Sequence, residues 1–243
     1  MPAPNQVEIA VIGAGVIGLA VARRLMATGH EVALIDPADP GSGASYGNAG
    51  TIADYAVMPV GTPDVLRNLP SLLFDRNSPL SIRRTALPSL APWLLQFARQ
   101  SLPAAARRNS AALAALLADA GASWLRLADD VGGTSILQKR GCLYLYETKA
   151  AYQAASADMD FRRGFGIKVD LISPDDLAKL EPGLPPVEGG AAFFPGAVFL
   201  NDPGRMMGLL ANGIPHIRAR VDWLGRRDSG VFLSGEEIGR AHV

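Results

Sequence analysis

The sequence is poor in the residues that build disulfides, metal sites and histidine-based catalysis. Its 243 residues include one cysteine, Cys142, and three histidines, none of which form a pair with metal-ligand spacing. A single cysteine excludes an internal disulfide, and its place in the alternating stretch GCLYLYE favours a packed thiol over a nucleophile. No G-x-S-x-G motif is present. We therefore expect no metal site, and a reaction whose difficult chemistry belongs to a cofactor.

Neither an excess charge nor a long apolar run is present. Lys plus Arg and Asp plus Glu both number 23, so no overall field attracts nucleic acid. Four arginine pairs are expected to be solvated: Arg83-Arg84, Arg107-Arg108, Arg162-Arg163 and Arg226-Arg227. The longest apolar run, residues 9–22, is too short to cross a bilayer and has no basic residue before it. We expect neither a signal peptide nor a transmembrane segment, and the scarcity of cysteine favours a reducing, cytoplasmic compartment.

The N-terminal stretch EIAVIGAGVIGLAVARRLMATGHEVALID has the pattern of a strand, a helix and a second strand. A buried parallel strand is predicted at residues 9–12, and a second at residues 32–35. Between them, Ile17, Val21 and Leu25 recur at helical spacing, and Gly29 can end the helix. The sequence predicts a βαβ unit.

The glycines of this unit match the dinucleotide-binding pattern G-x-G-x-x-G. Gly13 allows a tight turn, Gly15 lets a pyrophosphate approach the backbone, and Gly18 lets helix and strand pack closely. The N–H groups at the helix start then receive the phosphate charge. Asp36 ends the second strand, about twenty residues after the glycines, where such units place the carboxylate that binds the adenosine ribose. An ordinary β-turn-α connection is the alternative.

The segment after the second strand departs from a classical NAD domain, which continues with alternating strands and helices. A glycine-rich loop, DPGSGASYGNAGTI, comes instead, and a ligand is expected to lie against it because glycine permits close approach to the backbone. Residues 57–102 are proline-rich and helix-like, and residues 110–131 predict one long amphipathic helix. The fold class is therefore α/β, with a Rossmann-like nucleotide-binding domain split by an inserted α+β domain.

These motifs carry a resemblance. The opening stretch together with GSGASYGNAGTI is similar to the start of the D-amino-acid-oxidase-type flavoproteins, and YGNAG is most similar to their bacterial D-amino-acid dehydrogenase branch. The similarity continues through PWLLQFARQ, RGCLYLYET, ISPDDLAKLEPGL and FLNDPGRM, so it covers nearly the whole chain. It implies FAD as the cofactor, with the glycine-rich loop lying along the pyrophosphate, the ribityl chain and the flavin.

The resemblance also implies a domain plan. Residues 1–56 are expected to begin the FAD-binding domain, residues 57–200 to form a helical region and the inserted substrate domain, and residues 201–236 to return to the FAD-binding domain, which is left incomplete. The residues expected to bind FAD are Gly13, Ala14, Gly15, Val16, Ile17, Gly18, Asp36, Pro37, Ser42, Ala44, Ser45, Asn48, Ala49, Gly50 and Val221.

The implied reaction is hydride transfer from the substrate Cα to flavin N5, which gives an imino acid that water hydrolyses to a 2-oxo acid and ammonia. The partners implied are an amino-acid or amine substrate and an electron acceptor such as a quinone or another carrier. Tyr55 and Tyr144 are candidate substrate contacts, although packing of aromatic rings within a sheet also explains Tyr144. No catalytic acid or base is identified. Oxidation of glycine, sarcosine or another secondary amine remains an alternative, as does a non-catalytic nucleotide-binding fragment.

Two further segments bear on location and completeness. Residues 90–98, LAPWLLQFA, are expected to pack an apolar side on the core, with docking on the inner face of a membrane as the alternative. The last seven residues, EIGRAHV at 237–243, match an in-frame translation of a common sequencing adapter. We hypothesise that the native reading frame was cut near Gly235 or Glu236, so that the C-terminal part of the flavin domain is missing.

Overall fold

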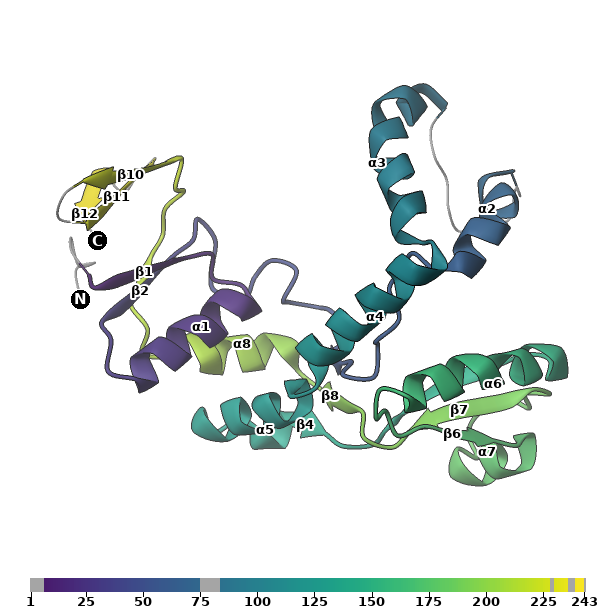
Figure 1. Cartoon of the computed structure of the whole chain (residues 1–243). Helices are drawn as coiled ribbons and strands as arrows, with labels where there is room; N and C mark the ends of the chain where they lie inside the picture. The colour runs from purple at the N-terminus through teal and green to yellow at the C-terminus, as the bar shows by residue number, and fades with distance from the viewer. Residues whose placement is uncertain (1–6, 75–83, 228–229, 236–238, 243) are drawn as a thin grey trace. The chain divides into compact units, whose positions relative to one another are not determined.

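The computed structural model describes residues 7–74, 84–227, 230–235 and 239–242. The chain divides into two compact units, each made of separate stretches of sequence (Figure 1). Unit 1 comprises Met1–Ile52, Ala122–Lys139 and Val198–Val243, and unit 2 comprises Ala53–Gly121 and Arg140–Ala197. This division differs from the domain plan drawn from the sequence, because residues 122–139 belong with the N-terminal unit. That the units are the FAD-binding and substrate domains stays a prediction.

Unit 1 begins with the predicted βαβ unit. Strand β1 (Ile9–Ile12) pairs in parallel with β2 (Val32–Ile35), and β2 pairs in parallel with β9 (His216–Ile217). Helix α1 (Val16–Ala27) joins the first two strands and ends before Gly29, which has a φ of +92°. The helix buries Leu19 and Ala22, whereas Ile17 and Val21 are exposed. The spacing of Ile17, Val21 and Leu25 therefore identified the helix but not its buried side.

A second sheet of unit 1 has the order β3-β8-β4. Its members are β3 (Thr51–Ile52), β8 (Val198–Leu200) and β4 (Leu137–Gln138), paired antiparallel. Helix α8 (Pro203–Ala211) begins after β8 because the carboxylate of Asp202 accepts a hydrogen bond from the Arg205 N–H at 2.8 Å, as an N-cap does. Helix α5 (Ala120–Asp130), the 3-10 turn Thr134–Ile136 and α8 share one hydrophobic core with α1 and β2.

The described C-terminal residues of unit 1 form an antiparallel sheet, β10 (Trp223–Arg227), β11 (Gly230–Gly235) and β12 (Gly239–His242). Val221, an expected FAD contact, lies two residues before β10 and packs against Ile35, Ala219 and Leu233. The proposed non-native tail, residues 237–243, lies partly outside the described residues, and its described part is β12. Its origin stays a hypothesis.

Unit 2 contains an antiparallel sheet of order β5-β7-β6: β5 (Cys142–Tyr146), β7 (Gly190–Phe194) and β6 (Asp170–Ile172). Helix α6 (Lys149–Arg163) packs on β5 and β7, and α7 (Pro174–Leu180) packs on β7. Helix α7 has a side-chain N-cap, because the Ser173 hydroxyl accepts a hydrogen bond from the Asp176 N–H at 3.2 Å. Thr148 caps α6 in the same way.

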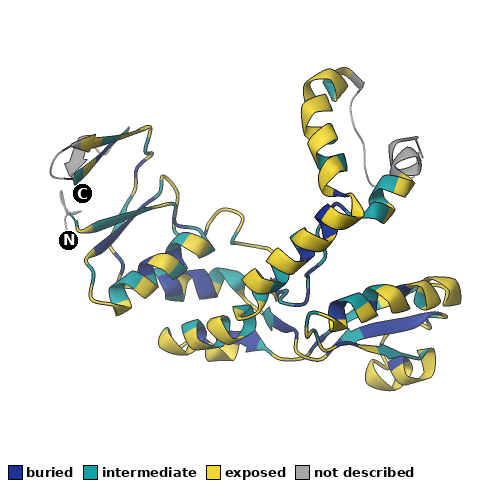
Figure 2. Cartoon of the chain, in the orientation of Figure 1, coloured by how far each residue is buried: buried dark blue, intermediate teal, exposed yellow. Residues whose placement is uncertain are grey.

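The rest of unit 2 is helical: α2 (Pro63–Phe74), the 3-10 turn Arg84–Ala86, α3 (Leu87–Gln100) and α4 (Pro103–Leu117). The predicted single helix over residues 110–131 is wrong, because turn residues 118–119 separate α4 from α5. The expectation that residues 90–98 pack on the core is met only in part, because Leu90, Leu94 and Phe97 are half-buried and no residue of α3 is fully buried (Figure 2). Residues 75–83 of the expected helical region lie outside the described residues.

One helical run in the described residues, Pro103–Asp130, is long and apolar enough by length and composition to cross a membrane. Core helices of soluble proteins pass the same test, and the turn at residues 118–119 interrupts the run. The sequence analysis expected no transmembrane segment. One helical run of this kind is by itself weak evidence that the chain crosses a membrane.

Candidate nucleotide-binding site

The glycine turn between β1 and α1 has the geometry that a bound pyrophosphate requires. Gly13 has a φ of +99°, which a side chain rarely tolerates. A Cβ on Gly18 would overlap the carbonyl oxygen of Gly13, so only glycine lets the helix lie so close to the strand. A Cβ on Gly15 would meet no backbone and only the Ser45 hydroxyl, at 3.4 Å. The backbone at Gly15 is therefore open to a ligand.

The start of α1 lacks the groups that usually satisfy a helix N-terminus. Its N-cap, Gly15, has no side chain to accept a hydrogen bond, and the first turn contains no acidic residue. Among the described residues no protein acceptor is found for the N–H groups of Gly15 and Ile17, while the Val16 N–H donates to the Ser45 hydroxyl at 2.9 Å. These N–H groups and the helix dipole fit a phosphate of a dinucleotide.

Asp36 lies beside this turn, as its place at the end of β2 predicts. Its carboxylate accepts hydrogen bonds from the N–H groups of Ala14 and Ala38, both at 2.8 Å. The neighbouring Pro37 lies within the short turn that the Ala38-to-Asp36 hydrogen bond closes. A carboxylate can accept further hydrogen bonds, so these contacts leave Asp36 able to bind a ribose hydroxyl. They also show a role that sequence spacing did not indicate, which is to fix the glycine turn.

The glycines of the loop at residues 39–52 have two different explanations. A Cβ on Gly41 would overlap Met207 of α8, and a Cβ on Gly50 would overlap the carbonyl oxygen of Leu200 in β8. Both also have positive φ, at +76° and +67°. A Cβ on Gly43 or Gly47 would meet nothing within 4 Å. The protein itself therefore requires Gly41 and Gly50, and only the other two present open backbone.

Asn48 and Ser42 hold the loop in shape through their side chains. The Asn48 amide accepts a hydrogen bond from the Gly50 N–H at 2.7 Å and donates to the carbonyls of Ala44 and Ser45. The Ser42 hydroxyl donates to the Asp39 carbonyl at 2.6 Å. Both residues were expected to contact FAD, and both are in the loop that would do so.

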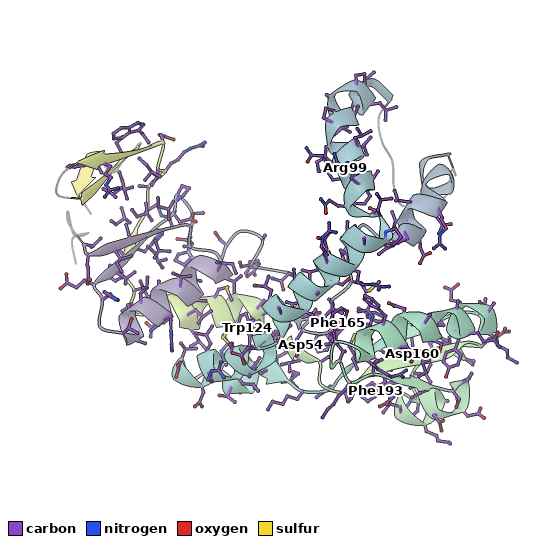
Figure 3. The ribbon with its side chains drawn as sticks, viewed as in Figure 1. Asp54, Arg99, Trp124, Asp160, Phe165 and Phe193 are labelled. Carbon is purple, nitrogen blue, oxygen red and sulfur yellow. The ribbon has the colours of Figure 1, made fainter. Side chains whose placement is uncertain are left out.

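A hollow of about 390 Å³ opens beside this loop within unit 1. Its lining includes five residues that the sequence pointed to: Val16, Ser45, Asn48, Ala49 and Gly50. It also includes Trp124 of α5, together with Leu200, Pro203 and Met207 (Figure 3). The sequence placed Trp124 only within the amphipathic helix expected at residues 110–131, and no local signal put its indole beside a loop more than seventy residues earlier.

The two candidate substrate residues lie together in unit 2. The Tyr55 ring stacks on Phe194, with centroids 4.6 Å apart, and meets Tyr144 edge-on at 6.0 Å. Tyr55 is buried, and burial, together with a hydrogen bond with the Cys142 thiol, raises the pKa of its phenol. Burial likewise raises the pKa of Tyr144. Both phenols therefore stay protonated at neutral pH, where they can donate hydrogen bonds but cannot act as bases.

Arg162 fixes this aromatic cluster. Its guanidinium donates to the backbone carbonyl of Tyr55 at 2.8 Å and lies over the rings of Tyr144 and Phe194, 5.9 Å from each centroid. It also donates to the Asp158 carboxylate at 3.3 Å. The expectation that the Arg162-Arg163 pair is solvated is wrong for Arg162, which is buried. A charged side chain is tolerated there because the carboxylate, the carbonyl and the ring faces replace water.

A separate cavity of about 300 Å³ lies within unit 2 beside Tyr55. Asp54, Phe165 and Phe194 contribute to its lining, and Asp54 and Phe165 are labelled in Figure 3. Burial raises the pKa of the Asp54 carboxyl, against two backbone hydrogen bonds that lower it. Tyr144 does not line this cavity.

Comparison with known proteins identifies the class. Residues 8–220 match the family described as FAD dependent oxidoreductase, DAO. The chain is 29% identical over 97% of its length to a D-amino-acid oxidase of Bradyrhizobium diazoefficiens, covering 56% of that protein. It is 30% identical over 95% of its length to D-amino acid dehydrogenase 2 of Ralstonia nicotianae, covering 58% of that protein. It thus spans little more than half the length of these relatives.

The solved structures agree on the fold. Glycine oxidase from Geobacillus kaustophilus matches 98% of the chain with a TM-score of 0.63 and 21% identity, over 53% of its own length. The chain belongs to the DAO family of FAD-dependent oxidoreductases. Its cofactor is FAD, and the open backbone at Gly15, the helix N–H groups and the Asp36 carboxylate fit the dinucleotide part of that molecule.

Proposed function

We propose that the protein to which this chain belongs oxidatively deaminates D-amino acids to 2-oxo acids. The support is its likeness, over 95% and 97% of the chain, to a dehydrogenase and an oxidase named for that substrate class. When bound, FAD would supply the group that accepts a hydride. The chain's own contribution is to hold the cofactor and to orient the substrate.

In this proposal the start of α1 binds the pyrophosphate and Asp36 binds the adenosine ribose. The hollow lined by Ser45, Asn48, Ala49, Gly50 and Trp124 receives the part of FAD on the flavin side of the pyrophosphate. The other expected contacts, at Ala14, Pro37, Ser42, Ala44 and Val221, are proposed on the same grounds and stay predictions. Because Ser45 accepts the Val16 N–H with its oxygen, its hydroxyl proton remains available to a phosphate oxygen.

Tyr55 is the better of the two proposed substrate contacts, because it lines the unit 2 cavity whereas Tyr144 does not. Its protonated phenol suits donation of a hydrogen bond to a carboxylate. Replacing Tyr55 by Phe keeps the ring stack on Phe194 and removes only the hydroxyl. We expect a raised KM with little change in kcat, and an unchanged KM would remove Tyr55 from the substrate site.

Two alternatives remain for the reaction. In the first alternative, the enzyme oxidises glycine, sarcosine or another secondary amine. In the second, the 243-residue chain binds a nucleotide without turnover. The second alternative is supported by the chain's length, because the chain covers only 56% and 58% of the two relatives. For the electron acceptor we propose a quinone or another carrier rather than oxygen, and for location the cytoplasm, with a peripheral association to the inner face of the membrane.

The deciding experiment is anaerobic reduction of bound FAD, monitored by its absorbance, with D-amino acids, L-amino acids, glycine and sarcosine as separate substrates. We expect bleaching by D-amino acids. Bleaching by L-amino acids only, or by sarcosine only, would reject the proposed substrate class. Tight FAD binding without bleaching by any of them would favour the non-catalytic alternative. Reoxidation by oxygen and by a soluble quinone then separates the two kinds of acceptor.

A further inference from the structure

The end of strand β2 is held by a segment that lies 180 residues later in the chain. The Asp36 N–H donates to the carbonyl of Ile217, in β9, at 3.2 Å. The Ala219 N–H donates back to the carbonyl of Asp36, also at 3.2 Å. Residues 216–219 therefore fix the main chain of Asp36, whose carboxylate is the proposed ribose contact.

Alternate residues of this segment make contacts on opposite sides. Ile217, Ala219 and Val221 pack into one small hydrophobic core, as the period of two in an extended chain predicts. His216 and Arg218 lie between them in sequence and contact the turn at residues 36–39 instead. Both are polar side chains with hydrogen-bond donors, and neither was singled out from the sequence.

His216 holds the first residue of the turn. Its Nε2 atom lies 3.1 Å from the carbonyl oxygen of Asp36. Because a carbonyl oxygen only accepts hydrogen bonds, Nε2 is the donor, and a neutral imidazole carries its proton there. The Asp36 carbonyl thus accepts two hydrogen bonds, one from the imidazole and one from the Ala219 N–H, which occupies both of its lone pairs.

Arg218 holds the last residue of the turn. Its guanidinium donates to the Asp39 carboxylate, and the two form an ion pair. Their side chains are 58% and 73% exposed, so water weakens the attraction. His216 is half-buried, and we therefore expect its contact to contribute more than that of Arg218.

These two contacts matter for a ligand because the turn carries the Asp36 carboxylate beside the start of α1. That carboxylate accepts hydrogen bonds from the N–H groups of Ala14 and Ala38. The adenosine ribose and the pyrophosphate of FAD belong to one molecule, so the sites for both must keep a fixed spacing. A turn that is fixed at both ends before the ligand arrives lowers the ordering cost of binding.

We propose that His216 and Arg218 are positioning residues for the adenosine half of FAD. They act through the turn at residues 36–39 and set the position of the Asp36 carboxylate. The proposal rests on the proposed ribose contact of Asp36 and is independent of the proposed substrate class.

The test is the binding of FAD to the whole chain, monitored by flavin fluorescence, and its displacement by ADP. ADP contains the adenosine and the pyrophosphate but no flavin. His216→Leu should raise the dissociation constants for FAD and ADP by the same factor, about threefold to tenfold, because one hydrogen bond is lost. Arg218→Gln should raise both by about twofold to fivefold, as expected for an exposed ion pair.

Three further variants separate positioning from folding. His216→Gln keeps an N–H donor at the position of Nε2 and should restore most of the affinity that His216→Leu loses. Arg220→Gln is the matched control, because Arg220 pairs with Asp222 at 3.2 Å, and both constants should stay within about twofold of wild type. Asn48→Ala alters the loop proposed to lie on the flavin side, and it should weaken FAD binding and leave ADP binding unchanged.

Several results would overturn the proposal. One is unchanged affinity for FAD and ADP in both His216→Leu and Arg218→Gln. Another is a loss of affinity for FAD without a loss for ADP, and a third is a His216→Gln protein that binds as weakly as His216→Leu. A wild-type chain that binds FAD and does not release it to ADP would overturn the proposal together with the ribose contact of Asp36. No measurement requires turnover, so failure here is distinct from failure of the proposed reaction.

Discussion

Helices α1 and α3 are both amphipathic and have similar lengths, 12 and 14 residues, yet α1 is packed in a core and α3 is largely exposed. Helix α1 buries Leu19 and Ala22 and contacts β1, β2 and α8. Helix α3 contacts α4 and the 3-10 turn Arg84–Ala86, and none of its residues is fully buried. Periodicity in sequence therefore shows that a helix has an apolar side, but not what covers that side. Three substitutions in these helices test this difference, and a fourth tests the buried carboxyl of Asp54; they are given from the largest expected effect to the smallest.

Gly18→Val should remove the close packing of α1 on β1. The new Cβ would overlap the Gly13 carbonyl oxygen, and neither backbone can move without opening the turn. We expect the free energy of unfolding to fall by about 3 kcal/mol or more, measured by urea denaturation. Gly43→Val is the matched control, since nothing lies within 4 Å of that position, and it should change stability by less than about 0.5 kcal/mol. Equal stability of both variants would refute the close packing.

Arg23→Gln should loosen the contact of α1 with α8. The guanidinium donates to the carbonyls of Leu210 at 2.6 Å and Leu209 at 3.0 Å, and also to that of Asn212, at the end of α8 where the helix dipole favours a cation. Losing these charged hydrogen bonds should cost about 2 kcal/mol in unfolding free energy. The neighbouring, exposed Arg24 provides the control variant Arg24→Gln, which should be near neutral. A larger loss in the control would contradict this role.

Asp54→Asn should stabilise unit 2 at neutral pH, by less than the losses above. Burial raises the Asp54 pKa in the folded chain, so the folded state binds the proton more tightly than the unfolded state. The unfavourable contribution is absent below the ordinary carboxyl pKa and grows as pH rises through the raised pKa. Unfolding free energies at acid and neutral pH should show the variant's gain only at neutral pH. A gain at both pH values would have another cause.

Leu95→Ala in α3 should have almost no effect on stability. Its side chain is 70% exposed and leaves no cavity when shortened, so the change should stay within about 0.5 kcal/mol. Leu19→Ala in α1 is the contrasting variant and should cost about 2–5 kcal/mol because Leu19 is fully buried. A large loss at Leu95 would show that something covers α3 in solution.

The βαβ unit could be predicted from the sequence because its determinants are local. Gly13, Gly18 and Asp36 act within thirty residues of one another, and the caps at Ser173 and Asp202 are set by their own helices. The FAD dependent oxidoreductase family and its cofactor were predicted from the resemblance of this unit and the glycine-rich loop to that family, and the prediction is confirmed.

The errors involve contacts between distant segments. The burial of Arg162 depends on Tyr55, 107 residues away, and no local pattern reveals that pairing. The place of α5 in unit 1, and so of Trp124 beside the glycine-rich loop, depends on packing against α1 and α8. The glycines at residues 41 and 50 were attributed to a ligand, whereas α8 and β8 require them. Such contacts are set by tertiary structure, which sequence spacing does not encode directly.

The most direct test of the glycine turn as the cofactor site is FAD binding by the wild-type chain and by Gly15→Val, monitored by flavin fluorescence. A valine at this position meets no backbone, so the fold should survive, while its side chain fills the space of the pyrophosphate beside the α1 N–H groups. We predict that Gly15→Val raises the dissociation constant for FAD at least tenfold and that Gly183→Val, at an open position of unit 2, does not. Equal affinity of wild type and Gly15→Val, with both proteins folded, would contradict the assignment of this turn to the cofactor.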